Sequence, residues 1–328
     1  MTVTRTARLT GAALCAALAL VVVLWMLRDL AALGPSTELL RYWVGDLRFR
    51  SRHATATSPV DALLVLVYAA TGAAALRSPL AASAFTVTGL ATLALRLPGL
   101  WASGVEVLLT TLLFLALAAG LVATAAAGRR DDGPESAPGP RPGLGPRSVS
   151  RPGTLPPPAR PSTGPAVAAG VLCATAALLW AGWELRWATL LPADHTLSRF
   201  TGGRGLQLPA LAVPPAWLNA VLVLLLLAAA VSAFARARPT RPLGLLAGLL
   251  LACVGASEAA AAPHPGRHAF PAEQGLYAGA YDLGCLFSLL AGLTVLALLA
   301  RPGRPRPAPY RPVAALPPAP PAKPPPGW

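Results

Sequence analysis

Four arginines at matched positions are the residues in this chain whose chemistry is easiest to name. Arg28 and Arg41 recur, 158 positions later, as Arg186 and Arg199. A guanidinium group holds a phosphate or a carboxylate through two parallel hydrogen bonds. The same side chain also anchors a helix end at a membrane surface by reaching toward the headgroups, which is its commoner role there. The four arginines therefore indicate either an anion site or a set of interfacial anchors.

A second set of polar residues lies within or at the ends of long apolar stretches. An ionised group at the centre of a membrane helix costs about 2.5 to 3.5 kcal/mol on insertion scales, so such groups usually face a partner or water. We expect Arg96 to pair with either Asp61 or Glu106. The alternative is that these residues lie at the headgroup boundary and are hydrated. The set is Asp61, Arg96, Glu106, Asn219, Glu258 and Asp282.

The two acidic residues of the second half have basic candidates only in the neighbouring loops. Glu258 and Asp282 could meet Arg186, Arg199 or His264. A carboxylate enclosed in the membrane without such a partner could bind a proton or a cation. Together with the arginines, this set forms our candidate ligand-binding residues, all expected at the outer side of the membrane.

An internal repeat relates the two groups of residues. A shift of 158 positions superimposes residues 14–70 on residues 172–228 without a gap, with eighteen identities among fifty-seven positions. Alanine and leucine account for many matches, but the rarer pairs Cys15/Cys173 and Trp25/Trp183 keep the same register. Asp61 corresponds to Asn219. A repeat of this length predicts two similar structural units related by a pseudo-two-fold axis.

The composition places these units in a lipid bilayer. Hydrophobic residues make up 55% of the 328 residues, charged residues make up 12%, and the mean hydropathy is +0.57. Soluble domains carry about twice that charged fraction. The net charge of +14 comes from scattered arginines that follow no groove-binding motif, which argues against a nucleic-acid partner. The lack of isoleucine and the abundance of Ala, Arg, Pro and Gly are typical of a GC-rich bacterial genome.

Eight segments are long and apolar enough to cross the hydrocarbon core, which needs about 20 residues of helix. The fold class that we predict is an all-α integral membrane protein with two parallel four-helix repeats and short interfacial helices in the outer loops. Ser36 and Asp194 are the expected N-caps of these short helices, and Gly45 and Gly203 mark their expected ends. The spans are residues 9–27, 59–76, 79–97, 104–127, 165–185, 216–235, 242–262 and 275–300, of which the third and seventh are the weakest.

Four domains and their sides of the membrane follow from these spans. Residues 1–127 and 165–300 form the two repeats, residues 128–164 a Pro/Gly/Arg-rich linker, and residues 301–328 a Pro-rich tail. Because each repeat has four spans, both termini lie on one side. The positive-inside rule makes that side cytoplasmic, because most basic residues fall in its loops and tails. Seven of the eight tryptophans then lie near the outer side, with Trp328 as the exception.

Sequence motifs give no enzymatic reaction. There is no phosphate-binding glycine loop, nucleophile elbow or zinc-protease motif, so we assign no catalytic residue, no metal and no cofactor. The four cysteines lack metal-knuckle spacing and are expected to be buried apolar residues. Of the histidines, His264 and His268 have helical spacing, but the prolines at 263 and 265 argue against one helix presenting both to a metal.

The function that we predict is therefore a non-enzymatic structural or regulatory component of the cell envelope. The lipid bilayer is its surrounding partner, and the tail at 301–328 is a candidate docking segment for a membrane or cytoplasmic protein, since proline-rich segments fit aromatic grooves. The alternative is a transporter or flippase for a small anionic or lipid-linked solute, with a site near the outer leaflet between the repeats. A membrane enzyme that acts on lipid-linked substrates is a third hypothesis.

Overall fold

The computed structural model describes nine stretches of the chain, which are mainly helical and include one short pair of strands and the loop segments 55–58 and 208–214. The stretches are residues 2–34, 36–44, 55–77, 82–101, 104–130, 163–202, 208–237, 239–262 and 276–300. The predicted tail and most of the predicted linker, together with His53, His264 and His268, lie outside them.

In the described part of the first half there are four long helices, one short helix and a 3₁₀ turn. The long helices are α1 (Arg5–Leu33), α4 (Pro59–Arg77), α5 (Ala82–Arg96) and α6 (Val105–Ala127). The short helix α2 (Ser36–Trp43) follows α1, and η1 (Leu97–Trp101) continues α5. Strands β1 (Thr2–Val3) and β2 (Arg129–Arg130) pair antiparallel and bring the start of α1 to the end of α6.

The second half contains four long helices and one short helix in the same order. The long helices are α7 (Thr163–Leu190), α9 (Pro215–Phe234), α10 (Thr240–Ala261) and α11 (Leu276–Ala300), and α8 (Ala193–Thr201) is the short one. In all, eight helices of the described chain are long and apolar enough to span a membrane. The predicted fold class, an all-α multi-pass membrane protein, is confirmed, and the two weakest predicted spans are helices α5 with η1 and α10.

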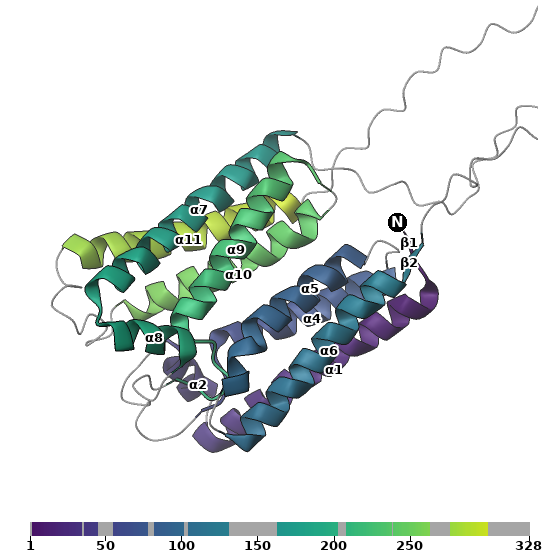
Figure 1. Cartoon of the computed structure of the whole chain (residues 1–328), viewed down its shortest axis with the longest axis horizontal. Helices are drawn as coiled ribbons and strands as arrows, with labels where there is room; N and C mark the ends of the chain where they lie inside the picture. The colour runs from purple at the N-terminus through teal and green to yellow at the C-terminus, as the bar shows by residue number, and fades with distance from the viewer. Residues whose placement is uncertain are drawn as a thin grey trace, which may run out of the picture.

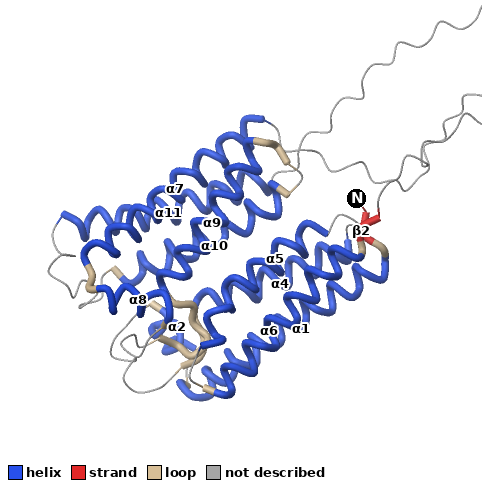
Figure 2. Tube along the Cα trace, in the orientation of Figure 1, coloured by secondary structure: helices blue, strands red, loops and turns tan. Residues whose placement is uncertain are grey.

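Two four-helix bundles lie side by side, one from each half of the chain (Figures 1 and 2). In the first bundle α1 packs on α4 and α6, and α5 packs on α6; in the second α7 packs on α9 and α11, and α10 packs on α11. The corresponding helices therefore make the corresponding contacts. The internal repeat itself stays a prediction, which this packing supports.

One end of both bundles carries the short helices α2 and α8, and the opposite end carries β1 and β2 (Figure 1). At the β1/β2 end, arginines cap helix C-termini: the Nε atom of Arg8 donates to Ala75 O at 2.7 Å, and that of Arg241 donates to Leu299 O at 3.0 Å. The last carbonyl groups of a helix have no partner within the helix, and they carry partial negative charge. These basic side chains therefore stabilise the ends of α4 and α11.

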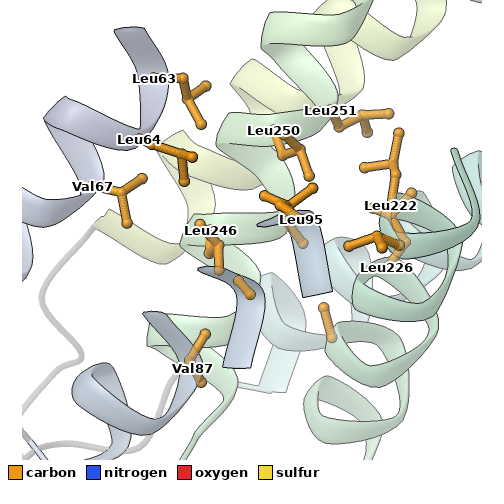
Figure 3. Packing of buried hydrophobic residues seen from close by; sticks show 14 of the residues in the cluster. Leu63, Leu64, Val67, Val87, Leu95, Leu222, Leu226, Leu246, Leu250 and Leu251 are labelled. Atoms are coloured by element: carbon orange, nitrogen blue, oxygen red, sulfur yellow. The ribbon is translucent and has the colours of Figure 1, made fainter. Parts of the chain in front are cut away.

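The two bundles share one apolar core. Leucine and valine side chains of α4 and α5 face those of α9 and α10 (Figure 3). Leu64, Leu95, Leu222 and Leu250 are at most 2% exposed. Lipid tails are as apolar as leucine, so the association of the halves depends on close packing and on polar contacts rather than on expulsion of water.

The short helices confirm one sequence expectation and correct another. Both helices exist, but α8 begins at Ala193 after Pro192, so Asp194 is inside the first turn and is not the N-cap. Gly202, at φ 74°, forms the left-handed C-cap where Gly203 was expected; Gly203 and Gly45 lie outside the described residues. The correction is physical: Pro192 already fixes the extended backbone that precedes a helix, and the sequence Gly-Gly leaves the choice of cap residue open.

Candidate functional site at the α2/α8 end

The buried charges of the first half form a closed network at the α2/α8 end. Arg96, at the end of α5, pairs with Asp61 in the first turn of α4, and both residues are at most 3% exposed. Asp61 also accepts 2.7 Å hydrogen bonds from the backbone N–H and the hydroxyl of Ser58. A serine before the helix and an acid in its first turn form a capping box. Of the two partners predicted for Arg96, Asp61 is therefore the one that pairs with it.

Asp29 is a buried acidic residue of this end that the sequence analysis did not select as a site residue. This aspartate near the end of α1 is 3% exposed, and it accepts hydrogen bonds from Ala56 N at 3.0 Å, from Thr57 N at 2.7 Å and from Thr57 Oγ1 at 2.6 Å. Several donors around one carboxylate compensate for its burial. Asp29 thereby fixes the segment that leads into α4 and its Asp61.

Polar contacts from this network cross to the second half of the chain. Arg96 Nη1 donates to Leu211 O at 2.9 Å, while Leu211 N donates to Ala56 O at 2.8 Å. Trp217 Nε1 donates to Ala94 O at 2.7 Å, and Trp101 Nε1 donates to Thr201 O at 2.9 Å. The α2/α8 end therefore joins the halves by directional hydrogen bonds rather than by apolar packing alone.

In the second half, Glu184, Arg199 and Asn219 form a smaller and more accessible cluster. Glu184 Oε1 accepts from Arg199 Nη2 at 2.7 Å and from Asn219 Nδ2 at 2.6 Å. The Arg199 guanidinium also lies 5.2 Å from the ring centre of Trp187. Since Asn219 corresponds to Asp61, the repeat keeps a polar residue here, but an amide replaces the charge.

Two further candidate residues of the first half, Arg28 and Glu106, meet on the exposed surface, although Glu106 was one of the two expected partners of Arg96. Arg28 Nη1 lies 3.4 Å from Glu106 Oε2, and the two side chains are 59% and 77% exposed. The guanidinium also lies 4.6 Å from the ring centre of Trp25. Exposed ion pairs contribute little to stability. Arg28 and Glu106 therefore lie as surface residues outside the buried network.

A cavity of about 400 Å³ opens beside these clusters, between the mouth of the second bundle and the first half. This size falls within the range of small-molecule sites. Tyr42 and Trp43 of α2 and the start of α4 form one side, while α7, α9, α10 and α11 form the others. Its polar lining residues include Arg186, Arg199, Asn219, Ser257 and Glu258.

Aromatic rings make up much of the cavity wall. Trp180, Trp183 and Trp187 each meet the Tyr281 ring edge to face, with ring centres 6.2, 5.1 and 6.5 Å away. Trp180 is 3% exposed and donates to Ser288 Oγ at 3.1 Å, so it forms the deep end. This packing holds the wall in place before any ligand binds.

Arg186 contributes a positive charge to the cavity. Its guanidinium lies 3.8 Å from the Tyr277 ring centre. Among the described residues, no carboxylate lies within ion-pair distance of Arg186. The cavity thus combines an aromatic wall with a guanidinium group whose hydrogen-bonding edge is available to an anion.

The structure divides the predicted site residues among separate clusters. Asp61 and Arg96 form the closed network, Arg28 and Glu106 the exposed pair, and Arg199 and Asn219 meet through Glu184. Arg186 and Glu258 line the cavity, where Glu258 Oε2 accepts from the Tyr281 hydroxyl at 3.4 Å. Arg41 lies on the exposed face of α2, and Asp282 is half-buried on α11.

Comparison of the chain with known protein families, with curated proteins and with solved structures finds no match. Within the described residues, no cluster of three or more His, Cys, Asp or Glu side chains could hold a metal ion. All four cysteines are free thiols, three of them buried and Cys253 partly so.

Proposed function

We propose that this multi-pass membrane protein is a non-enzymatic structural or regulatory component of the cell envelope, with both termini in the cytoplasm and the α2/α8 end outside. The observation that carries the proposal is the Asp61–Arg96–Leu211 network, which is buried and bridges the halves. Transport by rocking would have to break these hydrogen bonds in each cycle. The bond of this network that crosses between the halves is the one from the Arg96 guanidinium to Leu211 O. Hydrogen bonds to charged groups contribute about 1.5 to 3 kcal/mol, so a fixed arrangement is favoured.

A distance measurement tests whether the halves move against each other. Spin labels at Leu76 and Phe234, exposed residues near the β1/β2 end of each half, report one side of the membrane, and labels at Leu100 and Leu197 report the other. In liposomes with and without a proton gradient, a fixed component gives one narrow distance distribution for each pair. Two populations that shift in opposite directions at the two ends would contradict the proposal and indicate alternating access.

The second candidate is a transporter or flippase for a small anionic or lipid-linked solute. The cavity favours it, because it lies at the junction of the halves and carries an arginine on an aromatic wall. Sites between repeats are typical of secondary transporters. A fluorescent anionic phospholipid that crosses the bilayer of liposomes containing the protein, and does not cross protein-free liposomes, would support this candidate.

A further inference from the structure

The cavity of about 400 Å³ beside α7 has a lining suited to binding one kind of chemical group. We propose that it binds the phosphate group of an anionic phospholipid, with Arg186 as the residue that contacts the phosphate. This site goes beyond the envelope role proposed above and does not depend on it, because a fixed component and a transporter could each hold such a lipid.

Of the charged residues that line the cavity, Arg186 is the one whose position favours an anion; the carboxylate of the lining, Glu258, accepts from the Tyr281 hydroxyl at 3.4 Å. Arg199, which also lines the cavity, is neutralised by Glu184 at 2.7 Å, whereas Arg186 stacks on the Tyr277 ring and has no carboxylate within ion-pair distance among the described residues. A guanidinium stacked on an aromatic face keeps its N–H edge available, and that edge matches two phosphate oxygens. Asn219 and Ser257 add neutral hydrogen-bonding groups to the lining.

The surroundings of the cavity favour a lipid over a free anion. Leu190 lines the cavity and is 43% exposed, and Leu185 on the same helix is 69% exposed. On a membrane helix, such residues face the acyl chains. A headgroup held by Arg186 would therefore leave its chains along the outer surface of α7, without crossing polar protein surface.

The repeat provides an internal comparison. Arg28 corresponds to Arg186, but Arg28 pairs with Glu106 and stacks on Trp25, on an exposed surface. Asp29, the next residue, binds the segment before α4, whereas its counterpart Trp187 lines the cavity. Among the described residues, the second copy of the arginine therefore lines the cavity of about 400 Å³, whereas the first copy lies on an exposed surface.

The test is lipid binding to the full chain in detergent micelles, followed by native mass spectrometry. The probe is dioctanoyl phosphatidylglycerol, compared with dioctanoyl phosphatidylcholine and with glycerol phosphate. We expect one tight phosphatidylglycerol site, at least tenfold weaker phosphatidylcholine binding, and an affinity loss of at least tenfold in Arg186→Gln. The matched variant Arg28→Gln should bind as the unmodified protein does. Arg186→Lys keeps the positive charge but cannot donate two parallel hydrogen bonds, so its phosphatidylglycerol affinity should lie between those of Arg186→Gln and Arg28→Gln.

Three results would overturn the proposal. Equal losses in Arg186→Gln and Arg28→Gln would show general surface attraction, and phosphatidylcholine that binds as tightly as phosphatidylglycerol would show recognition of another group. Glycerol phosphate that binds as tightly as the lipid would show a site for free phosphate esters. Thermal unfolding of each variant shows whether it is folded. If Arg186→Gln does not fold, the lipid affinity of Arg186→Lys is compared with that of the unmodified protein instead. None of these results depends on the spin-label distances between the halves. The phospholipid site and the fixed envelope role can therefore be contradicted independently.

Discussion

Two matched positions in the halves carry different chemistry at the α2/α8 end. Asp29 corresponds to Trp187, and Asp61 corresponds to Asn219. In the first half both acids are buried and fully engaged, whereas in the second half their counterparts line an aromatic cavity. These two differences accompany the change from a closed polar network in the first half to an open cavity in the second half.

The buried pair of the first half gives the first prediction. Asp61→Leu or Arg96→Met alone leaves an uncompensated charge in the core, so each should lower the free energy of unfolding by about 3 to 5 kcal/mol. The double variant removes both charges and should recover much of that loss. Unfolding in detergent measures all three variants. Losses that simply add in the double variant would contradict a direct interaction between the two side chains.

The second prediction concerns Asn219, whose amide donates to Glu184 at 2.6 Å. Asn219→Asp recreates the residue of the first half, but it places two carboxylates in contact. We expect the variant to lose about 1 to 3 kcal/mol of stability at neutral pH, the range for a broken buried hydrogen bond. Adding Glu184→Gln restores an amide donor and leaves Arg199 a carboxylate partner. Failure of the second substitution to restore thermal stability would show that Asn219 acts through other contacts.

Sequence reasoning at this scale found most polar residues but not all of their arrangement. Arg96 was expected to pair with Asp61 or Glu106, and the structure shows Asp61, because the capping box of α4 already orients that carboxylate toward the core. Asp29 carried no such signal. Asp29 lies at the end of an apolar run. It accepts from the backbone N–H groups of Ala56 and Thr57, which are twenty-seven and twenty-eight positions away, and no local sequence pattern reveals contacts over that distance.

At the scale of the helices, α10 and α11 form the closest contact. A Cβ atom at Gly292 would lie 2.6 Å from both Ala252 N and Gly248 O, and one at Gly255 would lie 2.5 Å from Leu289 N. Small residues let membrane helices approach until their backbones touch, where dispersion and weak hydrogen bonds replace the missing hydrophobic effect. These glycines therefore set the distance between the two helices.

A pair of glycine variants on one helix tests this contact. Gly292→Ala must push α10 and α11 apart, so we expect a loss of about 1 to 3 kcal/mol, as for other overpacked cores. The matched variant Gly279→Ala meets no atom within 4 Å and should be neutral or stabilising, because alanine is the better helix former. Thermal unfolding in detergent compares the two variants. A Gly292→Ala protein that is as stable as Gly279→Ala would show that the contact tolerates separation.

The positions of the helices were predictable because twenty apolar residues leave the backbone few alternatives in lipid. Their ends were less predictable. The apolar stretch predicted a span at residues 9–27, but helix α1 runs from Arg5 to Leu33 and so continues past both ends of that stretch. Asp194 was expected to precede α8 as its N-cap, but the helix begins at Ala193, because Pro192 sets the backbone there.

At the scale of the whole molecule, the contacts between the halves were beyond sequence reasoning. The segment at 210–211 meets the segment at 55–56 through two backbone hydrogen bonds, and tryptophans cross between the halves in both directions. A repeat predicts two similar units but not the face by which they associate. The hydrogen bonds that join the described residues of the two halves lie at the α2/α8 end, beside the cavity, so the side of the membrane that this end faces decides which compartment the cavity serves.

Thiol labelling of intact cells tests the predicted orientation. After Cys15, Cys173, Cys253 and Cys285 are replaced by alanine, a single cysteine at the exposed Glu106 reports the α2/α8 end, and one at the exposed Arg236 reports the β1/β2 end. The positive-inside rule assigns the arginine-rich β1/β2 end to the cytoplasm. A membrane-impermeant maleimide should therefore label Glu106→Cys in intact cells and Arg236→Cys only after the cells are opened. The reverse pattern would invert the protein in the membrane and place the cavity, with Arg186, at the cytoplasmic leaflet.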